Sequence, residues 1–229
     1  MNHLSAAVDW LLDAQTWTGP GQLGARATEH LGYTAVAVLI AAVIALPAGL
    51  AIGHTGRGRA AAVLSSGAVR ALPTLGLLTL AALAAGVGLV APLIALVVLA
   101  VPSILAGAYA GVESVDRATV DAARAQGMNA WQVLWRVEVP LGLPIIIGGL
   151  RLAVLQVTAT ATLAAYVGAG GLGRPLFLGL RTYDYPMMLG ASLVVILLAI
   201  LLDACFEVVQ RLLSRAPGLA RPGRLREAR

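Results

Sequence analysis

Long apolar runs separated by short polar segments dominate the pattern of hydrophobic and polar positions along this chain. About 20 consecutive apolar residues are enough for a helix to cross a hydrocarbon core of ~30 Å. The pattern therefore predicts an all-α multi-pass membrane protein with about five spanning helices. We place them at about residues 31–53, 60–85, 90–110, 143–167 and 187–212. Because Pro73 lies inside the second run, a helix outside the membrane followed by a span that starts near Leu72 is the alternative there.

Composition supports this class and excludes several chemistries. The chain is 59% hydrophobic and 12% charged, whereas soluble domains carry about 25% charged residues. All sixteen basic residues are arginine, so the chain can hold neither a Walker A nucleotide loop nor a Schiff-base site, both of which need lysine. Cys205 is the single cysteine, which leaves no intrachain disulfide. The three histidines lack the spacing of metal ligands, and no catalytic constellation is visible.

The placement of arginine predicts the orientation in the membrane, because cytoplasmic loops carry the excess of basic residues. With the N-terminus outside and the C-terminus in the cytoplasm, eleven arginines face the cytoplasm and three (Arg26, Arg174 and Arg181) face outward. The eleven are Arg57, Arg59, Arg117, Arg124, Arg136 and the six from Arg211 to Arg229. Arg70 and Arg151 remain near or within the membrane. There they either face protein or water, or extend toward the membrane surface from near a helix end.

A polar segment at residues 117–140 interrupts the apolar pattern between the third and fourth predicted spans. Good helix formers before Gly127 and an N-cap candidate at Asn129 predict two short helices joined at Gly127. Trp131 and Trp135, four residues apart, share one face of the second helix and offer aromatic surface to a partner. Pro140 is expected to end this segment. The alternative is an ordinary surface loop with interfacial tryptophans.

This segment has the pattern of the "EAA" loop of ABC-importer permeases, which it resembles. The matching positions are Asp121, Ala122, Ala123, Gly127, Val137, Val139 and Pro140. Asp121 stands where glutamate is commoner, and the two valines stand where isoleucine and leucine are commoner. Residues 29–47 and 158–173 also resemble the permeases of glycine betaine, carnitine and choline uptake systems. The likeness covers about residues 28–212.

The resemblance implies a permease with the type I importer fold in a bacterial cytoplasmic membrane. It implies a permease domain at 28–212 with a cytoplasmic coupling loop at 117–140. The two ends lie outside the likeness, and their own residues predict an extracytoplasmic or interfacial segment at 1–27 and a basic cytoplasmic tail at 213–229. The implied partners are two copies of an ATPase subunit, an extracytoplasmic solute-binding protein, a second permease (the same chain or a sister) and membrane lipid. ATP and Mg would bind the ATPase. This chain would bind no cofactor or metal, perform no covalent chemistry and have no nucleic-acid partner.

Polar residues in the fourth predicted span suggest a path for the solute. Gln156, Thr158, Thr162 and Tyr166 supply most of its polar content, and Thr158 and Thr162 share a face. Such a face can line a translocation path. Threonines can equally bond carbonyls of their own helix or join neighbouring helices.

Glycines mark an outer turn and close helix contacts. Gly168, Gly170, Gly171 and Gly173 formally match a dinucleotide-binding pattern, but they follow an apolar span and lie outside any βαβ unit. A flexible outer turn, with or without a role as a gate, is the better interpretation. The pairs Gly49/Gly53 and Gly107/Gly111, each four residues apart, permit close contact between spans.

The solute and two rival classes complete the hypothesis. The resemblance implies a quaternary ammonium osmoprotectant: glycine betaine, carnitine, choline or proline betaine. The eleven aromatic residues are too sparse for an aromatic cage, so high-affinity recognition is expected on the binding protein. A permease for an amino acid is the nearest alternative. An ion-coupled transporter would need a carboxylate at the membrane midplane, for which Asp203 and Glu207 are the candidates, and an intramembrane enzyme lacks a nucleophile and base.

Overall fold

The computed structural model describes residues 3–19 and 22–214, which are helical apart from short connections. In chain order the helices are α1 (His3–Leu12), α2 (Ala14–Trp17), α3 (Leu23–Thr55), α4 (Arg59–Ala71), α5 (Thr74–Ala85), α6 (Val90–Glu113), α7 (Arg117–Ala125), α8 (Ala130–Val133), the π-helix η1 (Leu134–Glu138), α9 (Val139–Thr160), the 3₁₀-helix η2 (Ala161–Val167), α10 (Gly173–Thr182) and α11 (Tyr185–Ser214). The expected all-α class is confirmed. The basic tail expected at residues 213–229 lies outside the described residues except for the last two residues of α11.

Four helical stretches in the described part are long and apolar enough to cross a membrane. They are Leu23–Thr55, Val90–Glu113, Ala130–Val167 and Tyr185–Leu213. Each contains one of the predicted spans. The first begins well before residue 31, and the third includes α8, η1, α9 and η2 as one continuous stretch. The boundaries differ because a helix continues past the hydrocarbon core wherever its backbone hydrogen bonds remain satisfied.

The second predicted span is not a single straight helix. α4 and α5 meet at a bend of 90°, so the prediction of one continuous helix over residues 60–85 is wrong, and the break near Leu72 that the alternative included is confirmed. Proline forces the preceding residue out of the helical region, and Leu72 accordingly has φ −68° and ψ 132°. Pro73 thereby divides this apolar run into two differently directed helices.

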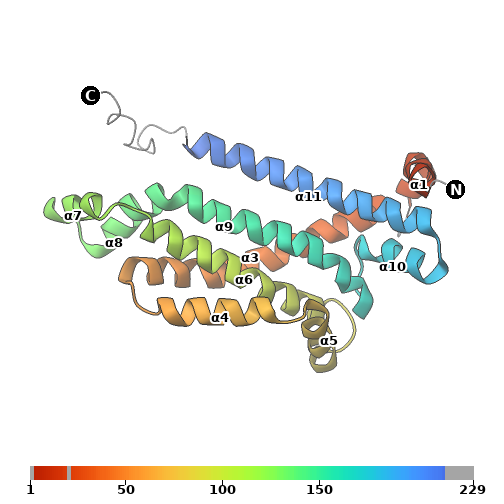
Figure 1. Cartoon of the computed structure of the whole chain (residues 1–229), viewed down its shortest axis with the longest axis horizontal. Coiled ribbons are helices and arrows are strands. Elements are labelled where there is room, and N and C mark those ends of the chain that lie inside the picture. Colours follow the sequence, from red (N-terminus) through yellow and green to blue (C-terminus); the bar gives the residue numbers. More distant parts are fainter. Residues whose placement is uncertain (1–2, 20–21, 215–229) are drawn as a thin grey trace.

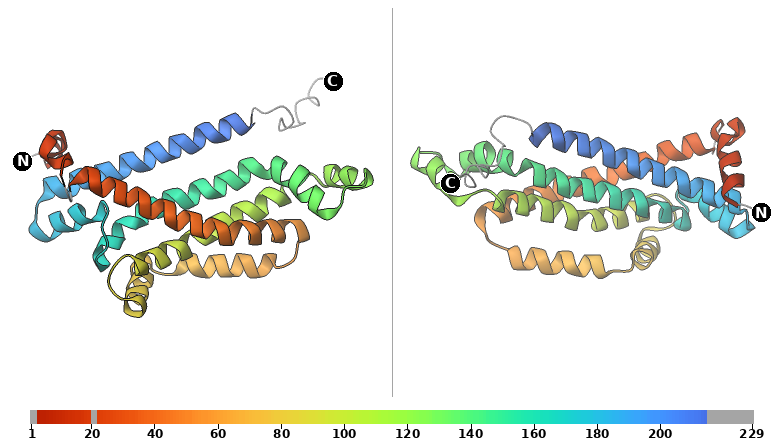
Figure 2. Two further views of the ribbon diagram at one scale, coloured as in Figure 1. Left: turned by 180° about the vertical axis from the view of Figure 1, so that it is seen from behind. Right: turned by 45° about the horizontal axis from the view of Figure 1, so that its top comes forward.

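The long helices form an elongated bundle (Figure 1). α6 and α9 lie side by side, with α4 on one side of this pair and α11 on the other, and α3 crosses behind them. One end of the bundle carries α7 and α8, and the opposite end carries α1, α5 and α10. Figure 2 confirms from two further directions that these ends are far apart. The segment around α7 and α8 is therefore presented away from the N-terminal helices.

Glycines allow α6 to approach both of its neighbours closely. Cβ atoms built on Gly49 and Gly53 of α3 would lie 2.5 Å and 2.7 Å from the Cβ atoms of Ala108 and Val112 in α6. On the other side of α6, a Cβ built on Gly107 would lie 2.5 Å from the Cα of Gly149 in α9. Gly111 of α6 likewise faces α9, at Gly142 and Ile146. Both predicted glycine pairs are thus confirmed as helix-contact positions.

Replacing Gly149 with alanine is expected to destabilise the bundle. The added methyl group would lie 2.6 Å from the Cα of Gly107 and 2.8 Å from the carbonyl oxygen of Ser103, which are backbone atoms that cannot move aside independently. Overpacking of this kind costs about 1–3 kcal/mol, so the thermal midpoint measured in detergent should fall. Gly67→Ala is the matched control because open space surrounds Gly67, and its midpoint should not fall. Equal midpoints for the two variants would contradict the close contact of α6 and α9.

Candidate functional site: the 117–140 loop and a polar groove

The first helix of the loop is fixed at both ends by local hydrogen bonds. Asp116 caps α7 by accepting a 3.1 Å hydrogen bond from the backbone N–H of Ala118. At the other end Gly127 has φ +87°, and its N–H donates to the carbonyl of Arg124 at 2.9 Å while the N–H of Met128 donates to that of Ala123 at 3.3 Å. This pair of bonds is a Schellman motif, which needs a left-handed residue. The predicted role of Gly127 as the joint between two helices is confirmed.

The second helix of the loop begins with a reciprocal cap. The side chain of Asn129 accepts a hydrogen bond from the N–H of Gln132, and the side chain of Gln132 accepts one from the N–H of Asn129, both at 2.9 Å. This capping box satisfies two backbone donors that the start of a helix leaves free. The predicted N-cap at Asn129 is confirmed, and the contribution of Gln132 was missed although the spacing of the two residues could have indicated it.

The two tryptophans form one exposed aromatic surface. The ring centroids of Trp131 and Trp135 are 5.6 Å apart in an edge-to-face arrangement, and the two residues are 68% and 46% exposed. Val133 and Leu134 on the other side of the helix are buried. Exposed aromatic surface of this kind can be covered by a partner protein or can lie at the membrane surface.

The other loop residues of the predicted motif take different environments. Ala123 is buried, Val137 and Val139 are half-buried, and Asp121, Ala122 and Pro140 are exposed. The small side chain of Ala123 therefore lets α7 pack closely against the rest of the loop.

Pro140 does not end the segment, contrary to expectation. α8, η1 and α9 form one continuous helical stretch, and Pro140 lies at the start of α9. Proline has no N–H to donate and its ring clashes with the carbonyl four residues earlier. The π-helical turn directly before it, Leu134–Glu138, is the kind of local adjustment that accommodates proline inside a helix. The loop is consequently joined to the span without a flexible break.

A buried contact between a carboxylate and a histidine connects the loop to the end of the first span. Glu138 is 5% exposed, and its carboxylate contacts Nδ1 of His54, which lies in the last turn of α3. A buried carboxylate needs a hydrogen-bonding partner because its desolvation is costly. This contact between residues far apart in the sequence was missed, since neither residue is part of a recognisable pattern.

The predicted path residues point to different neighbours. The hydroxyl groups of Thr158 and Thr162 bond carbonyls of their own helical stretch, those of Val154 and Ala159, at 2.8 Å each. Thr158 is buried, and its carbonyl lies 2.8 Å from Nε2 of His30 in α3. Thr158 therefore lies toward α3. Both threonine hydroxyls donate to carbonyls of their own helical stretch, as the alternative to a translocation path expected.

The remaining two path residues lie apart from Thr158. Gln156 accepts a 3.2 Å hydrogen bond from the hydroxyl of Ser103 in α6. Tyr166 is 59% exposed, and its ring centroid is 6.0 Å from that of Phe177 in α10. The four residues thus do not form one continuous polar face.

The glycine-rich turn at 168–173 is held by a carboxylate from α3. Gly168 and Gly171 have φ values of +90° and +77°, which glycine adopts at little cost. The N–H of Gly171 donates to Glu29 at 2.8 Å, and Glu29 also forms a 2.9 Å ion pair with Arg26. A Cβ atom on Gly170 would clash with the carboxylate of Glu29, and one on Gly173 would clash with the carbonyl of Thr162. Sequence reasoning missed Glu29 as the residue that anchors this turn.

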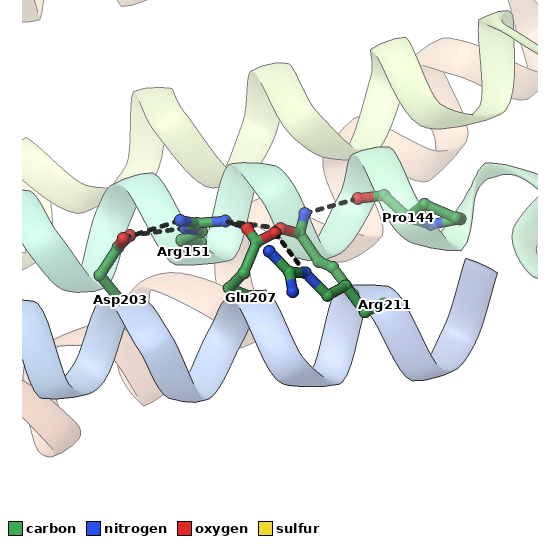
Figure 3. A network of polar contacts seen from close by, with 6 residues as sticks. Pro144, Arg151, Asp203, Glu207 and Arg211 are labelled. Carbon is green, nitrogen blue, oxygen red and sulfur yellow. Dashed lines mark hydrogen bonds and ion pairs between the residues drawn. The ribbon is translucent and has the colours of Figure 1, made fainter. Parts of the chain in front are cut away.

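A charged network joins α9 to α11 (Figure 3). The guanidinium group of Arg151 binds Asp203 through two nitrogens at 2.6 Å and 2.8 Å, and Glu207 at 2.6 Å. Arg211 binds the other oxygen of Glu207 at 2.9 Å. Gln210 accepts from Arg151 at 2.9 Å and donates to the carbonyl of Pro144 at 3.1 Å. Sequence reasoning considered Arg151 and the two carboxylates separately, although residues 203, 207 and 210 share one helix face and opposite charges in two apolar runs indicate a pair.

The same side of the bundle carries a groove of about 690 Å³. Its floor is formed by α6 and α9, including Gly107 and Gly149, and its walls include Arg70 of α4 and Asp203 of α11. Among the described residues no three histidine, cysteine, aspartate or glutamate side chains gather as a metal site. The groove thus combines charged side chains on its walls with mainly apolar surface elsewhere.

Comparison with known proteins gives a consistent family. The family model described as the binding-protein-dependent transport system inner membrane component matches residues 42–217. The glycine betaine/carnitine/choline transport system permease protein OpuCB of Bacillus subtilis (strain 168) is 33% identical over 85% of this chain and 89% of its own length. The carnitine transport permease protein OpuCB of Listeria monocytogenes is 33% identical over 85% of this chain and 90% of its own length.

A solved structure shares the fold. The inward-facing MetNI methionine ABC transporter contains a chain that superposes with a TM-score of 0.73 at 23% identity, over 82% of this chain and 94% of that one. The chain therefore has the expected type I importer fold. The family model and the close relatives each cover most of the sequence, and the chain belongs to the family of binding-protein-dependent transport system inner membrane components.

Proposed function

We propose that this chain is the permease subunit of an ATP-driven importer that carries a quaternary ammonium osmoprotectant (glycine betaine, carnitine, choline or proline betaine) across the cytoplasmic membrane. The observation that carries the solute class is the similarity to permeases of glycine betaine, carnitine and choline over 85% of the chain. A member of this family works with an ATPase and a solute-binding protein. ATP hydrolysis belongs to the ATPase, and the permease contributes the path and its changes in shape.

The 117–140 loop is the proposed docking site for the ATPase. Its exposed tryptophan pair supplies the aromatic anchor that protein interfaces favour, and its helices are fixed by the Schellman motif and the capping box. Two ATPase copies would each bind the loop of one permease, with the second permease being either the same chain or a sister. The loop is preformed in the isolated chain, so docking requires little ordering.

Two rigid connections would carry motion from the loop into the membrane. The stretch Ala130–Val167 runs without interruption from the tryptophans through α9, and the contact of Glu138 with His54 joins the loop to α3. When ATP brings the two ATPase subunits together, the loops would be drawn together and the spans would tilt with them. This is alternating access by rigid-body motion.

The proposed orientation has the N-terminus outside and the 117–140 loop and C-terminus in the cytoplasm, on the membrane of a bacterial cell. The arginine bias supports it. In the structure α7, α8 and the C-terminal end of α11 lie at the same end of the bundle, as this orientation requires. Arg26, Arg174 and Arg181 lie around a pocket of about 450 Å³ formed with Trp10 and Phe177, away from that end.

Exchange of Gly127 for valine is expected to uncouple ATP hydrolysis from the solute. Valine at φ +87° is strained because its Cβ clashes with the backbone, so the Schellman motif should open and the loop lose its docked shape. The measurement is ATP hydrolysis in proteoliposomes with the ATPase and the binding protein, with glycine betaine or choline added. Stimulation by solute should be at least about tenfold weaker, which corresponds to ~1.4 kcal/mol.

Gly32→Val is the control for this substitution. Gly32 lies in α3 with open space around it and an ordinary helical φ, so stimulation should remain. Wild-type hydrolysis that responds to neither solute would remove the osmoprotectant assignment, and hydrolysis unchanged by Gly127→Val would contradict the role of the loop.

Removing the tryptophan pair is expected to weaken ATPase binding without unfolding the permease. Trp131→Ala and Trp135→Ala delete exposed aromatic surface, and a central interface aromatic contributes about 2 kcal/mol or more, which is roughly thirtyfold in affinity. The measurement is the dissociation constant of the detergent-solubilised permease for its ATPase. Trp17→Ala at the opposite end of the bundle is the control, and equal affinities for all three variants would exclude the tryptophan surface as the docking site.

Labelling of single cysteines checks the orientation. With Cys205→Ser as the background, Arg117→Cys and Thr182→Cys each create one exposed thiol, since both positions are exposed. A membrane-impermeant maleimide added to whole spheroplasts should label residue 182 and leave residue 117 unlabelled until the membrane is opened. The reverse pattern would show that the loop faces outward, where no ATPase can reach it.

A further inference from the structure

The groove between α4 and α11 contains charged side chains at the depth of the spans. Arg70 contacts Ser103 in the middle of α6, and Arg151 and Asp203 lie well inside α9 and α11. The side chains of Arg151, Asp203 and Glu207 are 22%, 39% and 39% exposed. Charged groups at this depth face protein or a water-filled path, because exposure to lipid is costly. The side of the chain that carries the groove is therefore turned away from lipid.

The two arginines of the groove differ in how their charges are balanced. Arg151 forms its bidentate contact with Asp203 and a further ion pair with Glu207, so its charge is compensated. Arg70 makes a single long hydrogen bond, 3.5 Å to the hydroxyl of Ser103, and has no ion pair with any residue that the structure describes. Its side chain is exposed in the groove. Most of its five N–H donors remain available, in a planar fork that matches a carboxylate.

The walls and floor of the groove leave room for a small solute. The floor contains three glycines without side chains, Gly107, Gly148 and Gly149. Leu152 and Leu155 give it apolar surface. The volume of about 690 Å³ is within the range of ~300–1,000 Å³ typical of small-molecule sites. Asp203, whose two carboxylate oxygens are bound by Arg151, lies on the wall formed by α11.

We propose that Arg70 is a specificity-determining residue of the translocation path and binds the carboxylate of a zwitterionic solute in this groove. The quaternary ammonium group, which has no N–H to donate, would lie against the apolar surface of α9 on the side of Asp203. This inference rests on the proposed function as a quaternary ammonium importer. It goes further in assigning a preference for solutes that carry a carboxylate, such as glycine betaine, over choline, which carries none.

The lack of an ion partner for Arg70 gives this preference its physical basis. An uncompensated guanidinium group at membrane depth is stabilised by an anionic ligand, and a hydrogen bond to a charged group is stronger than a neutral one. Choline can occupy the apolar surface, but it has no carboxylate, so the charge of Arg70 stays without an ion partner. Binding that depends on one side chain of an open groove remains weak, so the solute can leave toward the cytoplasm.

The test compares uptake of glycine betaine and choline into proteoliposomes that contain ATPase and the same binding protein throughout. The preference of the binding protein cancels when the uptake ratio of a variant is divided by that of the wild type. For Arg70→Gln the glycine betaine to choline ratio should fall about tenfold or more, because the charged contact is lost for one solute only. For Arg70→Lys, which keeps the charge but not the planar fork, the ratio should fall less.

Arg59→Gln is the matched control. Arg59 lies on the same helix and is exposed, with an ion pair to Glu113 outside the groove, so its ratio should equal that of the wild type. Equal loss of both solutes in Arg70→Gln would assign Arg70 a structural role and overturn the inference, as would an unchanged ratio. If Arg70→Gln fails to assemble, Arg70→Lys decides: a lowered ratio with choline uptake retained supports the inference, and a wild-type ratio overturns it. Wild-type protein that takes up neither solute would overturn the proposed function, and this inference with it.

Discussion

The close contact of α6 with both α3 and α9 is the interaction on which the rest of the structure depends. In a membrane the apolar side chains gain little by leaving lipid for protein, so helices associate through close packing and polar contacts. Gly107 and Gly149 meet backbone to backbone, and Gly49 and Gly53 let α3 approach from behind. These four glycines set the distance between the spans, and Gly107 and Gly149 also line the groove.

Charged groups then divide the surface of the bundle into different environments. Arg151 forms ion pairs with both Asp203 and Glu207 between α9 and α11, so the charge of each has a partner. Arg70 on the facing wall lacks such a partner within the described residues and gives the groove its unbalanced positive charge. One polar face of the bundle therefore combines a structural network with a free guanidinium group, and both require that this face be covered by protein or water rather than lipid.

Local sequence was sufficient where structure depends on neighbouring residues. The helical class, the joint at Gly127, the cap at Asn129 and the shared face of Trp131 and Trp135 all follow from spacing and from backbone preferences. The break at Pro73 was foreseen only as an alternative, because a proline in an apolar run can either kink a helix or divide it. The end expected at Pro140 was wrong because a π-helical turn before it removes the conflict between the ring and the preceding carbonyl.

The sequence by itself determined that the chain crosses a membrane, since length and hydropathy encode this, and a pattern of adjacent residues predicted the two short helices of the 117–140 loop. Only the tertiary structure decided which distant residues meet. Glu138 contacts His54, Glu29 binds Gly171, and Arg151 forms an ion pair with Asp203, whereas Arg70 forms no ion pair with any described residue. The physical reason is that hydrophobic periodicity specifies which face of a helix is apolar, whereas the partner of a charged side chain depends on how neighbouring helices cross, and that crossing is set by the glycine contacts between them.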